Sequence, residues 1–127
     1  MNTDAARVRV FVVEDSALIR KRIVDDLLFL MRFDVVGVAE SESEAVAGVA
    51  ELLPDIVVTD IQLKEGSGLE VVRKIRARAP VPPPQIFVLT NYAFPEYKRQ
   101  CLVSGADAFL DKSSEYDRFL ALMRQAA

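Results

Sequence analysis

Residues 55–76 read DIVVTDIQLKEGSGLEVVRKIR, and this stretch holds one complete unit of the predicted fold. It begins with a short run of apolar, mostly β-branched residues, which is typical of a strand buried on both faces. The run ends at a lone carboxylate, Asp60. A turn containing two glycines follows, and apolar side chains then recur at helical spacing over residues 68–78. The stretch therefore predicts a buried strand, a turn and a helix, with a carboxylate where the strand ends.

The same unit recurs along the whole chain. Apolar runs rich in Val, Ile and Phe predict strands at residues 8–13, 33–39, 55–60, 85–90 and 106–110. Helical spacing of apolar residues predicts helices within 16–31, 43–53 and 68–78, and around Tyr116, Phe119, Leu120 and Met123. In the second of these helices, Val46, Val49 and Leu53 would form the buried face. A further helix is expected within 94–105, which has a proline near its start and a glycine at its end.

Strands and helices alternate strictly, which predicts an α/β fold with a parallel sheet and helices on both of its faces. With 127 residues, of which 51% are hydrophobic, the chain can bury one substantial core. No internal repeat or linker interrupts the pattern, and the PVPPPQ stretch at 80–85 leads directly into a strand. We therefore expect a single domain over residues 1–127.

The composition narrows the possible classes of function. A net charge of −3 argues against electrostatic binding to nucleic acid, which requires a basic face. No apolar run approaches the roughly 20 residues that span a bilayer, and the N-terminus lacks the layout of a signal peptide. The single cysteine, Cys101, cannot form an internal disulfide and is expected to pack in the core. Together these features predict a cytoplasmic protein without a direct contact to nucleic acid or membrane.

The chain contains no histidine, which removes several chemistries at once. Ser-His-Asp and Cys-His catalysis, imidazole acid–base work and a phosphohistidine carrier role are all excluded. With one cysteine and no histidine, a zinc site is not expected either. The remaining groups for chemistry are carboxylates, lysines, hydroxyls and a cation that prefers oxygen ligands.

Polar residues follow several of the predicted strands, where ligands bind in open α/β sheets. The first strand ends in Glu14 and Asp15, the third in Asp60, the fourth in Thr90 and the fifth in Lys112. If the first and third strands are neighbours, three carboxylates converge there, and a Mg²⁺ ion would relieve their repulsion. Lys112 could then bind a phosphoryl oxygen, and the set predicts a metal site with a carboxylate nucleophile.

At these residues the chain resembles the response-regulator receiver domains of bacterial two-component signalling. The motifs that carry the resemblance span nearly the whole chain, in order: VVEDS at 12–16, DIVVTDIQLKEGSGLEVVRKIR at 55–76, VLTN at 88–91 and GADAFLDK at 105–112. The resemblance implies a doubly wound, flavodoxin-like α/β fold with five helices and five parallel strands in the order 2-1-3-4-5. It also implies that Mg²⁺ is the cofactor, for which Mn²⁺ could substitute.

The resemblance assigns roles to the metal-binding residues by position. Asp60 would be the phosphoacceptor and a metal ligand, and Asp15 would bind Mg²⁺ directly. Glu14 would act mostly through a metal-bound water. The backbone carbonyl of Gln62 would be a further ligand.

The resemblance also implies a mechanism and a switch. Asp60 would attack the phosphorus of a phosphohistidine on a sensor histidine kinase or a histidine phosphotransfer protein, with Lys112 stabilising the transferred group. Thr90 would be the switch hydroxyl, and Phe109 the aromatic residue whose rotamer follows the state. The output would be a changed surface of the fourth helix, fifth strand and fifth helix, which would bind a downstream protein and could drive phosphorylation-dependent dimerisation.

Five positions bear on how the site would work in detail. Lys64 and Ser113 stand where many members of the family have proline, and Asn91 stands where many have a small residue. The geometry of the Lys112–Ser113 peptide therefore stays open. Tyr92 and Gln62 should flank the path of an attacking water, and a bulky Tyr92 would slow hydrolysis of the phosphoaspartate.

Other functions are compatible with parts of the sequence. A phosphorylation-independent receiver used as a scaffold would not need Asp60 and Lys112, which are both present. A flavodoxin-like cofactor binder would need a Ser/Thr/Gly-rich phosphate loop after the first strand, where the chain has EDSALIRK. An aspartyl-nucleophile phosphatase would need a second aspartate close to the nucleophile, which DIQLKEG lacks. A receiver taken from a longer DNA-binding regulator would have the same sequence features.

Overall fold

The computed structural model describes residues 7–126, which form a five-stranded parallel sheet with five helices. In chain order the elements are β1 (Val8–Val13), α1 (Ala17–Phe29), β2 (Phe33–Ala39), α2 (Glu42–Leu52), β3 (Ile56–Thr59), α3 (Gly68–Arg78), β4 (Gln85–Thr90), α4 (Pro95–Ser104), β5 (Ala108–Asp111) and α5 (Tyr116–Ala126). The strand order is β2-β1-β3-β4-β5, and every pairing is parallel. The α/β class and the strand order 2-1-3-4-5 are therefore confirmed.

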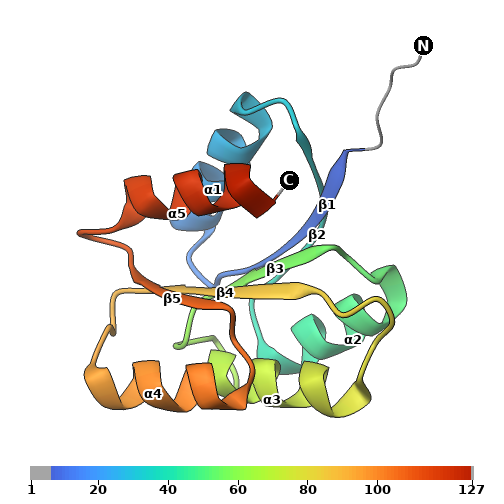
Figure 1. The fold of residues 1–127 in the computed structure, drawn as a ribbon, viewed down its shortest axis with the longest axis vertical. Coiled ribbons are helices and arrows are strands. Elements are labelled where there is room, and N and C mark those ends of the chain that lie inside the picture. The colour runs from blue at the N-terminus through green and yellow to red at the C-terminus, as the bar shows by residue number, and fades with distance from the viewer. Residues whose placement is uncertain (1–6, 127) are drawn as a thin grey trace.

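The helices cover both faces of the sheet. α1 and α5 lie together on one face, and α2, α3 and α4 lie on the other (Figure 1). Side chains of β1 alternate between the two layers, because successive side chains of a strand point to opposite faces. Val10 and Val12 pack in the layer below α1 and α5, whereas Phe11 and Val13 pack in the layer below α2 and α3. Burial on both faces explains why the strands are continuous apolar runs.

Several predicted boundaries differ from the structure by one or two residues, and β3, for example, spans Ile56–Thr59 rather than residues 55–60. β5 begins at Ala108, two residues later than predicted, because the Asp107 carboxylate rather than a backbone carbonyl accepts the Ile86 N–H at 2.7 Å. Leu53 was expected on the buried face of α2, and this was wrong. It is the left-handed C-cap residue of that helix (φ 48°), which turns its side chain to solvent, and it is 53% exposed.

A serine is the N-cap residue of each of the three helices that follow β1, β2 and β3. Each hydroxyl accepts the backbone N–H of the residue three positions on, which satisfies one of the open donors of the first turn. The pairs are Ser16 with Ile19, Ser41 with Glu44, and Ser67 with Glu70. These caps fix where the chain turns at the carboxyl edge of the sheet, and so they position the loops of the candidate site.

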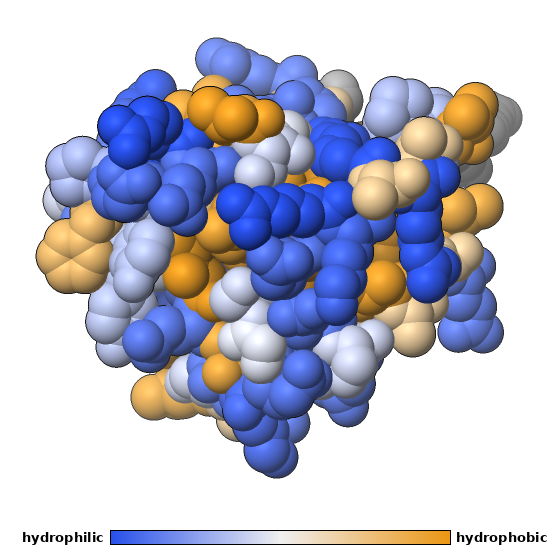
Figure 2. Space-filling view, turned by 90° about the horizontal axis from the view of Figure 1, so that it is seen from below, coloured by the Kyte–Doolittle hydropathy of each residue, from blue (hydrophilic) through white to orange (hydrophobic). Residues whose placement is uncertain are grey.

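The surface over α2, α3 and α4 is mostly hydrophilic. Figure 2 views the molecule from this side, and hydrophobic side chains appear in separate patches between polar ones. Cys101 of α4 is fully buried in the layer beneath, as expected from its packing role. None of the helices within residues 7–126 is long and apolar enough to cross a membrane.

Candidate functional site

The carboxyl ends of β1, β3 and β5 bring an ammonium group between two carboxylates. Lys112 Nζ lies 2.5 Å from Glu14 Oε1 and 2.8 Å from Asp60 Oδ2. All three side chains are at most 9% exposed. The sheet enforces this meeting, because parallel strands end at the same edge and β1 and β4 flank β3. Lys112 is therefore in direct contact with both Glu14 and Asp60.

Asp60 is held at both carboxylate oxygens. Its Oδ1 accepts the backbone N–H of Ile61 at 2.6 Å, while Oδ2 accepts from Lys112. Its own backbone N–H donates to Val13 O, which ties it to β1. Thr59, immediately before it, donates its hydroxyl to the Asp60 carbonyl at 2.8 Å. The carboxylate thus has a defined orientation, directed at the end of β5.

The electrostatics of the cluster follow from burial and from Lys112. Burial raises the pKa of Glu14 above its usual value, and the hydrogen bonds from Lys112 and from the Ser16 N–H oppose that effect only in part. For Lys112, burial acts to lower the pKa, but hydrogen bonds to Asp60 and Glu14 outweigh it and raise the pKa overall. Lys112 is therefore a firmly protonated cation at neutral pH, beside two acceptors.

Asp15 is placed differently from the other acids. It does not cap α1, because Ser16 occupies the N-cap position, and its side chain is exposed. Within residues 7–126 no group of three or more His, Cys, Asp or Glu side chains is close enough to hold a metal ion by itself. The expected convergence of three carboxylates is therefore not formed, because Glu14 turns toward Lys112 while Asp15 faces solvent.

The oxygen atoms at the carboxyl edge of the sheet suit a hard cation even without a cluster of three carboxylates. Mg²⁺ binds one or two carboxylates together with carbonyl oxygens and water. Asp15 and Asp60 could supply the carboxylates and Gln62 a backbone carbonyl. Gln62 lies in the β3–α3 loop, which folds back on itself through an isolated antiparallel bridge between Gln62 and Ser67. All these donors are oxygens on the loops that follow β1 and β3, and so the residues fit magnesium.

The β3–α3 loop closes tightly against the phosphoacceptor candidate. Gly68 donates its N–H to Ile61 O at 2.8 Å. A Cβ on Gly68 would lie 1.8 Å from the Asp60 carbonyl oxygen, so only glycine fits there. We therefore assign this glycine to close backbone approach, as well as to turn formation.

Thr90 and Phe109 lie on the same face of the sheet. Val88 pairs with Phe109 in register, and Thr90 is two residues beyond Val88 on β4. Both are buried, Thr90 fully and Phe109 with 6% exposed. The Thr90 hydroxyl accepts the Tyr92 N–H at 3.0 Å. The two side chains therefore lie on the same side of the sheet.

The positions that depart from the common pattern are accommodated on the surface. Lys64 is exposed and lies 3.8 Å from Glu40. The Lys112–Ser113 peptide is trans, since the cis bond within residues 7–126 is Val81–Pro82. Ser113 instead donates both its N–H and its hydroxyl to Asp111 Oδ1.

Sequence reasoning missed one buried acid near the site. Glu42, in the first turn of α2, is 7% exposed and binds the β3–α3 loop and α3. It lies in the polar run ESESE at 40–44, which carries no local sign of burial. Its partner Lys74 is 32 positions away, so only the tertiary structure brings the pair together.

Comparison with known proteins identifies the family to which the chain is similar. The family model described as the response regulator receiver domain matches residues 10–124. The signal receiver domain of the response regulator NarL from Mycobacterium tuberculosis superposes with a TM-score of 0.86 at 27% identity. That likeness covers 96% of this chain and 98% of the NarL domain.

Two curated relatives are longer proteins. The DNA-binding transcriptional activator DevR/DosR of Mycobacterium tuberculosis is 35% identical over 105 residues, which are 83% of this chain and 48% of the activator. A protein-glutamate methylesterase/protein-glutamine glutaminase of Syntrophus aciditrophicus is 35% identical over 109 residues, which are 84% of this chain and 31% of that enzyme. The chain thus spans about half or less of the length of these relatives.

Proposed function

This chain belongs to the response regulator receiver domain family, and we propose that it is a phosphorylation-controlled signalling module with Asp60 as its phosphoacceptor. The observation that carries the proposal is the placement of Lys112 Nζ at 2.8 Å from Asp60 Oδ2. A buried carboxylate that is oriented by a backbone N–H and faces a protonated amine is suited to nucleophilic phosphoryl transfer.

In the proposed reaction an Asp60 carboxylate oxygen attacks the phosphorus of a phosphohistidine. The new O–P bond forms as the bond from phosphorus to the imidazole nitrogen breaks, and the imidazole leaves with that electron pair. Lys112 stabilises the negative charge on the equatorial oxygens and then stays paired with the phosphoryl group. Glu14 also binds the Lys112 amine, at 2.5 Å, and would help to hold it beside Asp60.

Magnesium would supply charge neutralisation for the phosphoryl oxygens when bound. Asp15 and Asp60 would provide its carboxylate ligands and Gln62 its carbonyl ligand. Glu14, whose two oxygens accept from Lys112 and from the Ser16 N–H, would contribute only through water. Manganese prefers the same oxygen ligands and would substitute.

The proposed output is a population shift at α4, β5 and α5. A phosphoryl group brings about −1.5 to −2 charges at neutral pH. The Thr90 hydroxyl would leave the Tyr92 N–H to bind it, and Phe109 would turn into the vacated space. A sensor histidine kinase or histidine phosphotransfer protein would be the phosphoryl donor in the cytoplasm. An unidentified downstream protein, or a second copy of the chain, would bind the altered surface.

The decisive test is the intact mass after incubation with acetyl phosphate and MgCl₂. The parent should gain the mass of one phosphoryl group, and both Asp60→Asn and the parent in EDTA should not. A parent that gains no mass from acetyl phosphate or from a phosphorylated histidine kinase, and that binds no Mg²⁺, would instead be a phosphorylation-independent scaffold.

The relatives suggest a second possibility for the context of the domain. DevR/DosR is a DNA-binding activator, and the other relative is a methylesterase, each longer than this chain. The residues described here could therefore regulate an output region of a longer protein. Because the net charge of this chain is −3, any DNA contact would have to come from such a region.

A further inference from the structure

The β3–α3 loop, residues 61–67, is hydrogen-bonded to the first turn of α2. Glu42 donates its backbone N–H to Glu65 O at 2.8 Å, and its carboxylate Oε1 accepts the Ser67 N–H at 3.1 Å. Ser43 adds a second connection, because its hydroxyl donates to Glu65 Oε1 at 3.0 Å. The loop is therefore tied at two of its residues to the start of one helix.

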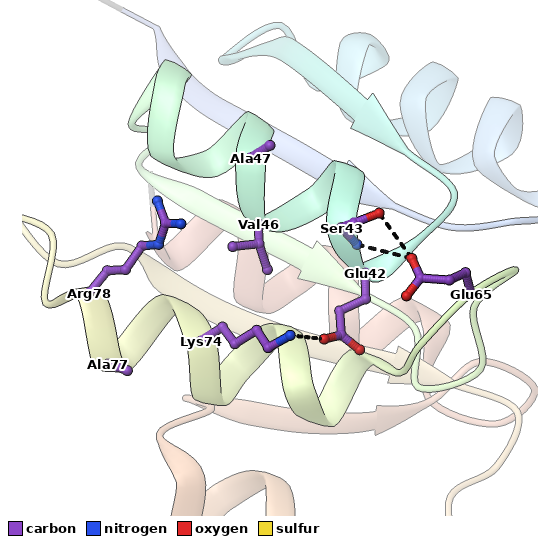
Figure 3. A pocket seen from close by; sticks show the side chains of 8 residues that line it. All are labelled: Glu42, Ser43, Val46, Ala47, Glu65, Lys74, Ala77 and Arg78. Atoms are coloured by element: carbon purple, nitrogen blue, oxygen red, sulfur yellow. Dashed lines mark hydrogen bonds and ion pairs between the residues drawn. The ribbon is translucent and has the colours of Figure 1, made fainter.

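The Glu42 carboxylate is itself fixed by a lysine of α3. Lys74 Nζ lies 2.5 Å from Glu42 Oε2, and the Glu42 side chain is 10% exposed. Figure 3 shows Glu42 reaching from α2 toward Lys74, with Ser43 and Glu65 beside it at the same end of the pocket between α2 and α3. The hydrogen bond from Lys74 lowers the pKa of Glu42, so the carboxylate is charged at neutral pH.

The Glu42 side chain packs closely against the loop backbone at Gly66. Gly66 has φ +77°, and a Cβ added to it would lie 2.2 Å from Glu42 Oε1 and 2.4 Å from Glu42 Cβ. The backbone of the loop thus rests directly on the Glu42 side chain. A side chain at residue 66 would displace one or the other.

The same loop carries the candidate carbonyl ligand. Ser67, which donates to Glu42, is paired with Gln62 across the loop. Beyond Ser67, Gly68 closes the loop onto Ile61, next to Asp60. A short path of backbone contacts therefore runs from the Glu42 carboxylate, through Ser67, to Gln62.

We propose that Glu42 is a positioning residue for the divalent cation, because it holds the loop that presents the Gln62 carbonyl. The inference rests on the proposed function, since it presumes that a cation binds at Asp60. Burying a carboxylate costs free energy, which its bonds to Ser67 and Lys74 offset. Outer groups that orient metal ligands typically change metal affinity by about 10- to 100-fold when removed.

The test compares Glu42→Ala and Glu42→Gln with Glu51→Gln. Glu51 is exposed on the same helix, so its replacement removes the same charge without touching the loop. Affinity for Mg²⁺ is measured from amide chemical shifts during a titration with MgCl₂ alone, and exchange of the Ser67 amide is measured without metal. Far-UV circular dichroism establishes that each variant is folded at the temperature used.

Glu42→Ala should weaken Mg²⁺ binding about tenfold and speed exchange of the Ser67 amide. Glu42→Gln keeps an acceptor for Ser67 but loses the ion pair with Lys74, so it should fall between Glu42→Ala and Glu51→Gln. Folded Glu42 variants that bind Mg²⁺ as tightly as Glu51→Gln would overturn the inference, and Glu42→Gln decides it if Glu42→Ala does not fold. A parent that binds no Mg²⁺ would instead overturn the proposed metal site, and with it any positioning role.

Discussion

Lys112 and Glu14, which are 98 positions apart in the chain, form a hydrogen bond of 2.5 Å between Nζ and Oε1 at the carboxyl edge of the sheet. Because the same amine also binds Asp60, one cation forms ion pairs with two buried carboxylates. Breaking a buried pair by removing one partner usually costs more than the pair contributes, because a charge is left without compensation. The cluster is therefore both a structural and a chemical unit.

Replacing Lys112 with methionine should destabilise the protein at pH 7 by about 3 kcal/mol, because two buried carboxylates would then face each other unpaired. Urea unfolding followed by circular dichroism measures the change. Lys98→Met is the matched control, since Lys98 is exposed on α4, and its effect should stay within about 0.5 kcal/mol. Equal stabilities of the two variants would contradict the structural role of Lys112.

Glu42 should stabilise the protein only when it is ionised. Its pKa is lowered in the folded state, chiefly by the hydrogen bond from Lys74. The stabilisation is therefore fully present above the ordinary glutamate pKa of 4.5 and is lost as the pH falls through the lower folded value. Urea unfolding at several pH values should give a stability difference between parent and Glu42→Gln that is constant near neutrality and shrinks in acid. A difference that grows on acidification would be the wrong sign.

Gly68→Ala should destabilise the protein even though alanine favours helices more than glycine does. The added Cβ would meet the Asp60 carbonyl oxygen at 1.8 Å, and that neighbour is backbone that cannot rotate away. A cost of about 1–3 kcal/mol is expected, as for overpacking elsewhere in cores. Thermal unfolding tests it, and an alanine variant at least as stable as the parent would mean that the loop can open there without cost.

Tyr92→Ala should shorten the lifetime of the phosphoaspartate severalfold. Tyr92 is 39% exposed and its backbone N–H donates to the Thr90 hydroxyl. The prediction requires that its ring shields Asp60 from attacking water. Loss of the phosphoryl mass after removal of acetyl phosphate gives the rate. Tyr92→Phe retains the ring and should decay as the parent does; if all three proteins decay alike, shielding by this residue is ruled out.

Cys101 should resist alkylation in the folded protein. Burial raises the pKa of its thiol to about 11, and the side chain has no exposed surface. Iodoacetamide at pH 8 should therefore modify the native protein only as fast as it unfolds, and the denatured protein quickly. Mass spectrometry follows the reaction, and rapid labelling under native conditions would show that α4 opens locally.

Local pattern predicted the elements well because burial of a strand or helix leaves a period in the sequence. β1, β2, β4 and α3 begin and end at the predicted residues. The prediction that Leu53 is buried was wrong because its spacing fits a helix face, whereas the residue is the left-handed C-cap of α2 and lies outside the helical repeat. Periodicity reports the interior of an element better than its end.

Candidate site residues were predictable where the fold puts a chemistry-bearing residue directly after a strand. Asp60 and Lys112 follow that rule, and the motifs that contain them indicate the family from the sequence alone. The three carboxylates do not form the expected cluster, because Glu14 binds Lys112 and the Asp15 side chain is exposed to solvent. Such a choice depends on partners from distant strands, which no local pattern encodes.

The alternation of strands and helices, the absence of histidine chemistry and the residues at the strand ends all follow from the amino-acid sequence. These depend on short-range periodicity and on composition. The contacts of Lys112 with both Glu14 and Asp60 depend on how the strands and helices pack. So does the burial of Glu42 against a loop and a lysine 32 positions away. A buried charge is stable only beside a group of opposite charge or a hydrogen-bond partner, and the packing of strands and helices determines which group lies there.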